Sequence, residues 1–237
     1  MHDGRRILAV VPARGGSKGI PLKNLRTVGG VSLVARAGQV ARAVAAIDRA
    51  VVSTDHEGIA AEAEKSGLAA PFRRPPELSG HTVGDWDVLQ HALVTMEDLD
   101  GAVYDIVLML QPTSPNRTPE HVACTIAALA EGDFDAVWTL SETDSKGHPL
   151  KQLTVSAQCG LDYYDPAGSA IVARQQLTPV YHRNGIAYAF TRQCLLKQKT
   201  IKGRRTGAVI ITEPVANIDT ELDLAWAEFL LGRDRQL

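Results

Sequence analysis

The chain lacks most features of secreted, membrane-spanning or disulfide-framed proteins. Its 237 residues include three cysteines, Cys124, Cys159 and Cys194, which are far apart and form no Cys-x-x-Cys pair. An odd, scattered set of this kind fits reduced thiols and supports neither a disulfide frame nor a Cys/His metal cluster. No apolar run approaches the length of a membrane span, and the first residues lead into a strand and not into a signal peptide. We therefore expect a soluble, cytoplasmic protein with no membrane partner.

An excess of either charge is also missing, as are the commonest phosphate-binding signatures. The net charge is −2, which argues against a surface that coats nucleic acid. The chain contains neither the Walker pattern, Gly-x-x-x-x-Gly-Lys-Ser/Thr, nor the dinucleotide fingerprint, Gly-x-Gly-x-x-Gly. Ordinary ATPase and dehydrogenase interpretations therefore lose their main support.

Strand-like and helix-like segments alternate along most of the chain. The apolar pattern predicts strands at 7–11, 50–53, 106–110, 136–139, 186–191 and 207–211, and helices at 33–46, 56–66, 85–96, 119–131 and 221–231. The 106–110 segment is entirely apolar, as is typical of parallel strands that are covered on both faces. Such alternation indicates an α/β domain with a doubly wound, mostly parallel sheet.

The alternation stops between residues 142 and 182. Glycine and proline recur in this stretch with short apolar pieces, and no helix is predicted. An excursion of this length within a compact domain is usually a lid, an arm or a disordered segment.

The segment from Ile7 to Leu25 is the most informative in the chain. A predicted strand ends at Pro12 and is followed by a loop with three glycines, Gly15, Gly16 and Gly19, and the cations Arg14, Lys18 and Lys23. Glycines let a ligand approach the backbone N–H groups, and Arg and Lys supply charge-assisted donors for phosphate oxygens. A buried strand that opens into such a loop is the expected geometry for binding a polyphosphate at the carboxyl edge of a parallel sheet. Glycines that serve tight packing alone are the alternative.

This loop resembles the signature of the CMP-sialic acid synthetases, the acylneuraminate cytidylyltransferases. Further segments match the family in order and spacing: Val51-Val-Ser-Thr-Asp55, Arg74-Pro-Pro-Glu-Leu78, Leu110-Gln-Pro-Thr-Ser-Pro115, His148-Pro-Leu-Lys151, Arg174-Gln-Gln-Leu177, Asn184-Gly185 and Ile218-Asp-Thr-Glu-Leu-Asp223. Several short motifs in register, covering nearly the whole chain, are more specific than any single one.

The resemblance implies a fold, a reaction and an assembly. It implies a Rossmann-like nucleotidyltransferase domain over residues 1–141 and 183–237, with residues 142–182 as a small dimerisation arm that also reaches into the active site of the partner. It implies a homodimeric, CTP-dependent enzyme that uses Mg²⁺ and transfers CMP to a small acidic acceptor, with no nucleic-acid partner.

The resemblance also assigns residues to CTP. Arg14 and Lys18 would hold the β- and γ-phosphates, and Lys23 and Asn24 the region of the phosphate and the sugar. Asp85 stands where the family often has a serine near the cytosine base. The catalytic set implied is Arg14, Lys18, Lys23 and Asp219, and the CTP-binding set is Ala13, Gly15, Gly16, Ser17, Asn24 and Asp85.

The remaining implied residues serve the acceptor and the metal. Gln111 and Thr113 would face the acceptor, although a proline-stiffened turn is the alternative for this segment. Lys151 and Arg174 would bind an acceptor carboxylate, although each taken singly is an ordinary surface charge. The implied acceptor set is Gln111, Thr113, Lys151, Arg174, His182 and Asn184, and the implied Mg²⁺ ligands are Asp219 and Asn217.

Three positions depart from the family pattern. Asn217 and His81 stand where aspartate is usual, and His182 stands where arginine is usual. Asparagine offers Mg²⁺ a neutral oxygen and no charge, so a second metal near the acceptor would be weakened. A phosphonate acceptor is already ionised and needs only orientation, so these changes fit CMP transfer to a phosphonate. Neutral change around a site for a nine-carbon 2-keto sugar acid of the sialic acid type fits as well, and that acceptor is preferred because Lys151 and Arg174 are retained.

Two further hypotheses stay open. The chain could be a nucleotide-binding regulator on a transferase scaffold, since one metal carboxylate is missing. It could also be a sugar-1-phosphate uridylyl- or guanylyltransferase, because that class shares the fold. Arg14, Lys18 and Asp219 argue against the first, and the segments that begin at Arg174 and Ile218 argue against the second.

Overall fold

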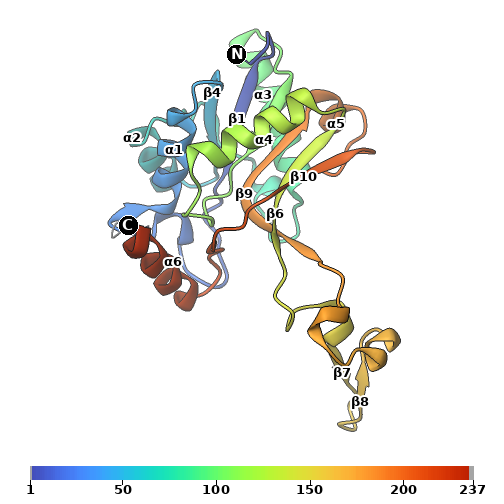
Figure 1. Ribbon diagram of the computed structural model, residues 1–237. Coiled ribbons are helices and arrows are strands. Elements are labelled where there is room, and N and C mark those ends of the chain that lie inside the picture. The colour runs from blue at the N-terminus through green and yellow to red at the C-terminus, as the bar shows by residue number, and fades with distance from the viewer. Residues whose placement is uncertain (1, 235–237) are drawn as a thin grey trace. The chain divides into compact units, whose positions relative to one another are not determined.

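The computed structural model describes residues 2–234 (Figure 1). The chain divides into two units. The first contains the residues up to Thr139, Asn184–Val209 and those from Glu213 onward, and the second contains Leu140–Arg183 and Ile210–Thr212. Each unit is described by itself.

A six-stranded sheet in the order β10-β6-β9-β5-β1-β4 organises the first unit. Its strands are β1 (Ile7–Pro12), β4 (Arg49–Ser53), β5 (Ile106–Met109), β6 (Ala136–Glu142), β9 (Tyr181–Thr191) and β10 (Thr206–Ile210). Strand β1 pairs in parallel with both β4 and β5, whereas β9 runs antiparallel to β5. The predicted α/β class with a doubly wound sheet is confirmed, and the sheet is a mixed one.

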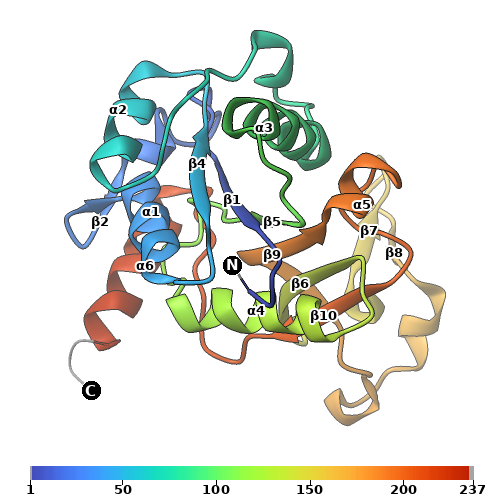
Figure 2. The ribbon, with the colours of Figure 1, turned by 90° about the horizontal axis from the view of Figure 1, so that it is seen from above.

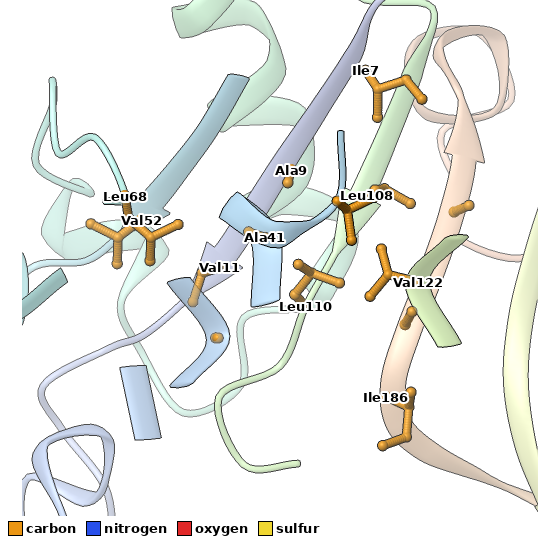
Figure 3. Packing of buried hydrophobic residues seen from close by; sticks show 14 of the residues in the cluster. Ile7, Ala9, Val11, Ala41, Val52, Leu68, Leu108, Leu110, Val122 and Ile186 are labelled. Carbon is orange, nitrogen blue, oxygen red and sulfur yellow. The ribbon is translucent and has the colours of Figure 1, made fainter. Parts of the chain in front are cut away.

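Helices cover both faces of this sheet, which explains why its central strands are apolar at every position. Along β1, Ile7, Ala9 and Val11 pack into one core cluster, while Leu8 and Val10 pack into a second. The first cluster lies under α1 (Leu33–Ala43), α2 (Glu57–Lys65) and α4 (Pro119–Glu131), and Figure 3 shows part of it. The second lies under α3 (Asp85–Asp100) and α5 (Arg192–Leu196), on the opposite side of the sheet in Figure 2. Successive strand side chains point to opposite faces, so both must be apolar here.

A third cluster joins the C-terminal helix to the loop that follows β1. Helix α6 (Glu221–Asp234) buries Leu224, Ala227 and Leu230 against Ile20, Ile218 and the small hairpin β2 (Thr27–Val28) and β3 (Val31–Ser32). Ile20 follows the glycine loop, and Ile218 precedes Asp219. Hydrophobic burial therefore brings together two segments about two hundred residues apart in sequence.

Most predicted elements are present, and their ends differ for local reasons. Helix α4 has the predicted bounds because Thr118 and His121 form a capping box and Pro119 occupies the first turn. Helix α1 ends at Ala43, before the predicted residue 46, because Val44 adopts an extended backbone. Helices α3 and α6 run on to Asp100 and Asp234, and strands β6 and β9 are longer than their apolar cores.

The second unit has little regular structure. It contains an antiparallel hairpin, β7 (Leu153–Val155) with β8 (Leu161–Tyr163), and three short 3-10 helices, at Pro149–Lys151, Pro166–Ala170 and Arg174–Gln176. The hairpin exposes apolar side chains, since Val155 and Leu161 are each 67% exposed. The predicted role of residues 142–182 in dimerisation stays a prediction.

Candidate active site

A cavity of about 280 Å³ lies in the first unit, beside the carboxyl ends of β1 and β5 and the start of α3. Its lining combines the glycine loop, the loop before α3 and the turn after β5: Pro12, Arg14, Ser17, Lys23, Asn24, Arg74, Leu78, Gly80, His81, Val83, Asp85, Val88, Gln111, Pro112 and Thr113. This is the edge at which ligands of open α/β sheets bind.

A second cavity, of about 480 Å³, is larger but chemically less suited to a nucleotide. Residues near the start of α4, the 213–215 segment and the end of α6 line it, and none of them belongs to the glycine loop. Three cations, Arg14, Lys23 and Arg74, line the smaller cavity instead. Since a polyphosphate needs several positive donors, the smaller cavity is the candidate active site.

Hydrogen bonds at several points hold the glycine loop in place. The Ala13 N–H donates to Ser53 O at 2.9 Å, and the Gly15 N–H donates to a carboxylate oxygen of Asp55 at 2.7 Å. Asn24 Nδ2 donates to Arg14 O at 2.9 Å. The loop is therefore fixed in shape before any ligand binds, which lowers the entropy cost of binding.

The glycines of this loop have different functions. A Cβ at Gly15 would lie 2.9 Å from His56 Cβ, and one at Gly19 would lie 2.5 Å from the carbonyl oxygen of Asp219. A Cβ added at Gly16 would have no other heavy atom within 4 Å. Packing alone therefore requires glycine at 15 and 19, whereas Gly16 leaves the backbone open to a ligand.

The cations of the loop also differ in placement. Arg14 lines the cavity, and its Nη1 donates to Gly80 O at 2.8 Å. Lys18 is exposed and is not part of the cavity lining in the described structure. Ala13 is fully buried and its N–H already donates to Ser53 O, so its predicted contact with CTP stays a prediction.

Lys23 connects the loop to the segment before α6. Its ammonium donates to Asp219 Oδ1 at 2.8 Å and to Ile218 O at 2.6 Å. The Lys23 side chain is 14% exposed and that of Asp219 is 74% exposed. The predicted catalytic residues Lys23 and Asp219 are thus paired, and Lys23 lines the cavity whereas Asp219 is not part of its lining.

Arg74 is a cavity-lining cation that was not predicted as a site residue from the sequence motifs. It is 5% exposed, yet it lines the cavity. Its Nε donates to Ser53 Oγ at 3.1 Å, and its Nη2 donates to Ser53 O. Burial lowers the pKa of Arg74 to about 10, against the opposing charge of Asp55. A buried guanidinium beside an open cavity is a strong donor for an anion or a carbonyl, because the low dielectric strengthens its interactions.

Comparison with known proteins identifies the family. Residues 8–230 match the family described as cytidylyltransferase. The chain belongs to the cytidylyltransferases. It is therefore a CTP-dependent nucleotidyltransferase, and the resemblance drawn from its motifs is confirmed.

Individual relatives are distant but similar over most of the chain. The chain is 28% identical over 226 residues to the post-translational flagellin modification protein B of Campylobacter coli, covering 95% of this chain and 94% of the relative. It is 28% identical over 232 residues to the CMP-N,N'-diacetyllegionaminic acid synthase of Legionella pneumophila, covering 94% of each. It is 29% identical over 230 residues to N-acylneuraminate cytidylyltransferase A of Danio rerio, covering 95% of this chain and 50% of that longer relative.

Solved structures show the same fold. The structure of CMP:2-keto-3-deoxy-manno-octonic acid synthetase complexed with CTP has a TM-score of 0.69 at 18% identity, and the match covers 97% of this chain and 99% of that one. The 4-diphosphocytidyl-2C-methyl-D-erythritol synthase of Anaerococcus prevotii has a TM-score of 0.60 at 18% identity, covering 98% of this chain and all of that one.

On the other side of the cavity, the turn after β5 holds Gln111 and Thr113. Thr113 O accepts a hydrogen bond from the Ile218 N–H at 2.9 Å, which attaches this turn to the segment that carries Asp219. Asn184 lies nearby and is 2% exposed, and its Oδ1 accepts hydrogen bonds from Thr139 Oγ1 at 2.7 Å and from the Ile186 N–H at 3.2 Å. Its amide oxygen therefore has a structural function, and a contact between Asn184 and the acceptor stays a prediction.

The second unit contains the other three predicted acceptor residues. Lys151 is exposed at the end of a 3-10 helix. Arg174 lines a small cavity of about 60 Å³ within this unit, together with His148. His182 Nδ1 lies 2.9 Å from Thr143 Oγ1. Their roles toward an acceptor stay predictions.

The segment before α6 carries the two residues predicted to bind a magnesium ion, Asn217 and Asp219. Asn217 and Asp219 are exposed on either side of the buried Ile218. Within residues 2–234, no group of three or more His, Cys, Asp or Glu side chains could hold a metal. Mg²⁺ in nucleotide sites commonly uses one or two carboxylates together with substrate phosphates, so the exposed carboxylate of Asp219 fits such an ion. The amide oxygen of Asn217 is a neutral second donor.

Within the described residues, no helix is long and apolar enough to cross a membrane. The predicted cytoplasmic location stays a prediction.

Proposed function

We propose that this cytidylyltransferase transfers CMP from CTP to a nine-carbon 2-keto sugar acid of the sialic acid type. The family and the cation-lined cavity support CTP as the donor. Relatives named as synthases or cytidylyltransferases of N,N'-diacetyllegionaminic, N-acylneuraminic and pseudaminic acids, each matching at least 94% of this chain, support the acceptor class.

In the proposed reaction, a hydroxyl oxygen of the acceptor forms a bond to the α-phosphorus of CTP. The bond between that phosphorus and the bridging oxygen to the β-phosphate breaks, pyrophosphate leaves, and the hydroxyl proton passes to solvent. Catalysis of this kind depends mainly on alignment and on charge neutralisation. Arg14, Ser17 and Lys23 lie where they can hold the triphosphate, and Lys18 would join them from the same loop.

The nucleoside would occupy the side of the cavity lined by Leu78, Val83 and Val88. These apolar side chains suit a base and not a phosphate. Asp85 and Arg74 flank them with an acceptor and a donor. A carboxylate can accept from the exocyclic amine of cytosine, which uracil lacks, so this side would favour CTP over UTP. We propose that Asp85 takes the place of the family serine in this way.

Asp219, with Asn217 beside it, would hold Mg²⁺ against the phosphates. A bound ion would neutralise phosphate charge and lower the pKa of a nearby hydroxyl. In the structure, Lys23 neutralises one oxygen of the Asp219 carboxylate, and Ile218 fixes the backbone at that position.

We further propose that the second unit forms a homodimer. Its hairpin exposes Leu153, Val155 and Leu161, and Val172 is 91% exposed. Such apolar exposure is typical of interaction surfaces, and two-fold pairing is the commonest closed assembly. Light scattering at micromolar concentration would test this proposal, and a monomer would refute it.

The observation that carries the enzymatic proposal is the gathering of Arg14, Lys23 and Arg74 around one cavity in a chain of this family. The test measures pyrophosphate release with Mg²⁺ and each of CTP, UTP, ATP and GTP. The acceptors are N-acetylneuraminic acid, a legionaminic acid, a pseudaminic acid, 2-keto-3-deoxy-octonic acid and simple phosphonates, and the product is identified by mass spectrometry.

A CMP-sugar formed from CTP with a nine-carbon acid is the expected result. Turnover with phosphonates and with none of the sugar acids would show that the acceptor is a phosphonate. None of the comparisons supports that alternative. Equal use of UTP would contradict the role given to Asp85. Binding of CTP with no turnover of any acceptor would favour a nucleotide-binding regulator.

A further inference from the structure

Arg117, at the end of the turn that carries Gln111 and Thr113, has an unusual environment. The residue is 6% exposed. Its guanidinium donates to three backbone carbonyls: Nη2 to Gln111 O at 2.6 Å and to Gly185 O at 2.9 Å, and Nε to Ile186 O. Carbonyl dipoles are thus its hydrogen-bond partners, and no carboxylate of residues 2–234 is among them. Burying a full charge in this way costs free energy that an apolar residue would not.

The benefit of this arrangement is geometric. A guanidinium carries five N–H donors in a rigid planar fork, so it can fix several carbonyls at once. Arg117 fixes the carbonyl of Gln111, six residues before it, to those of Gly185 and Ile186, which are 68 and 69 residues after it. The turn after β5 and the first-unit part of β9 are therefore held together by one side chain.

Other contacts reinforce the same junction. Ser114 Oγ donates to Asn184 O at 3.0 Å, and the Gly185 N–H donates to the Tyr188 hydroxyl oxygen at 2.7 Å. Gly185 has φ +76°, and the place of its missing Cβ is filled by Ser114 Oγ and, at 2.8 Å, by Gln111 Oε1. The amide of Gln111 thus packs over Gly185, so the junction sets the position of this cavity-lining side chain as well as its backbone.

The junction continues to the catalytic segment through Thr113. Thr113 O accepts from the Ile218 N–H at 2.9 Å, and Ile218 O in turn accepts from Lys23 Nζ at 2.6 Å. Arg117, the Gln111–Thr113 turn and the segment that carries Asp219 form one connected series of contacts. The first part of the glycine loop, in contrast, is held separately, because Ala13 donates to Ser53 and Gly15 donates to Asp55.

We infer that Arg117 is a positioning residue of the active site. It sets the Gln111–Thr113 turn and, through Thr113, the Ile218–Asp219 segment, while the first part of the glycine loop, residues 13–15, is held by Ser53 and Asp55. The inference rests on the proposed function only for the acceptor used in the kinetic assay.

The test compares Arg117→Lys with Arg192→Lys. Lysine keeps the charge at residue 117 but loses the fork, so the three carbonyls are no longer fixed together. Arg192 pairs with Glu97 at 2.8 Å, and neither residue belongs to the cavity lining, so its variant controls for a general loss of stability. Three quantities are measured on the full chain: hydrogen exchange of residues 184–190 and 216–220, CTP affinity by calorimetry, and kcat with KM for both substrates.

For Arg117→Lys we expect faster exchange in both segments and a fall in kcat of about 10- to 100-fold, the scale of a misplacement of about 1 Å. CTP affinity should change much less than kcat, because only the Lys23 end of the glycine loop contacts the Ile218–Asp219 segment. Arg192→Lys should change none of these. Ser114→Ala should shift the same quantities in the same direction by less, and it decides the question if Arg117→Lys does not fold.

Wild-type exchange and kcat in Arg117→Lys, or in Ser114→Ala where only that variant folds, would overturn the inference. So would a loss of CTP affinity as large as the loss of kcat, because that would indicate general disruption. If the wild-type protein turns over none of the acceptors, the proposed function fails separately, and hydrogen exchange together with CTP affinity still decides the role of Arg117.

Discussion

The glycine loop and the loop after β5 each contain an arginine, and they use it differently. In the glycine loop, Arg14 lines the cavity and is only partly buried, with one donor on Gly80 O. In the loop after β5, the guanidinium of Arg117 is enclosed and donates to three backbone carbonyls. The first loop is shaped by backbone N–H groups and keeps its cation for a ligand. The loop after β5 uses the guanidinium of Arg117 to fix its own backbone.

This difference indicates how the two sides of the cavity should respond to mutation. On the glycine-loop side, replacing Arg14 or Lys18 should remove a positive charge from the proposed triphosphate site and leave the fold intact, because neither residue is buried. On the Gln111 side, the side chains proposed to contact a substrate depend on the buried contacts of Arg117 and Ser114. The predictions below test this contrast, from the largest expected effect to the smallest.

The largest effect is expected for the glycine-loop cations. Arg14→Ala and Lys18→Ala should each lower kcat by about 10²–10³-fold, since that is the usual cost of removing one charge stabiliser from an active site. The melting temperature should stay near the wild-type value, because Arg14 is only partly buried and Lys18 is exposed. Steady-state kinetics with CTP and thermal unfolding measure both. Near-normal turnover in both variants would refute the assignment of this loop.

The next effect separates two glycines of the same loop. Gly19→Ala would place a Cβ 2.5 Å from Asp219 O, so the loop or the Asp219 segment must shift. We expect a loss of about 1–3 kcal/mol in the free energy of unfolding, the usual cost of overpacking, together with reduced activity. Gly16→Ala is the matched control, because no heavy atom lies within 4 Å of its new Cβ. Denaturant unfolding of both variants makes the comparison, and equal stability of the two would contradict the packing role of Gly19.

Asn217→Asp tests the acceptor side. If the acceptor is a sugar hydroxyl, an added carboxylate strengthens the proposed Mg²⁺ site, and activity stays equal or rises. A dianionic phosphonate would instead be repelled, by about 1 kcal/mol at 4 Å in water and more in a partly buried site. Its KM would then rise while that for CTP stays constant. Measuring the KM for the acceptor and the KM for CTP distinguishes a sugar acceptor from a phosphonate. An unchanged acceptor KM would mean that Asn217 is not near the acceptor.

The smallest effect lies away from the cavity, at the ion pair of Glu97 and Arg192. Burial raises the pKa of Glu97, but the hydrogen bond from Arg192 and the one from the Tyr104 N–H outweigh it, so the pKa is lower than the ordinary 4.5. A carboxyl with a lowered pKa stabilises the fold above its unfolded pKa, and this stabilisation is lost as pH falls through its folded pKa.

Glu97→Gln should therefore be less stable than the wild type at pH 7, by about 0.2–1 kcal/mol for a partly exposed pair. The difference should shrink as the pH falls below 4.5, the ordinary pKa of the carboxyl. Urea unfolding at several pH values measures it, and kcat at pH 7 should not change. A difference that stays constant down to pH 3 would show that the ion pair is not its source.

Sequence patterns were sufficient for much of the fold and for part of the site. The central strands were predictable because β1 and β5 are covered on both faces and must be apolar throughout. The strand within β9 was also predicted, but its antiparallel direction was not, because pairing direction leaves no mark on an apolar run. The glycine loop was recognisable since glycines and cations are dense there, and the motif order led to the correct family.

The two buried arginines of the site, Arg74 and Arg117, were not recognisable in this way. Arg74 begins one of the short motifs and Arg117 lies two residues beyond another, but nothing in their neighbours distinguishes a buried arginine from an exposed one. Arg74 is enclosed because β4 supplies Ser53, and Arg117 because β9 supplies Gly185 and Ile186. The hydrogen-bond partners of both arginines are distant in sequence, so only the folded structure shows that these two side chains are buried.

The amino-acid sequence by itself determined the class of fold and the family, because apolar periodicity and motif order are local properties of the chain. The tertiary structure decided which residues share the cavity, which glycines are required by packing, and which arginine is left for a ligand. These depend on contacts such as those of Gly19 with Asp219 and of Arg117 with Gly185, which form only when segments distant in sequence pack together. Burial then sets the cost and the strength of each charge, and burial is a property of the folded chain.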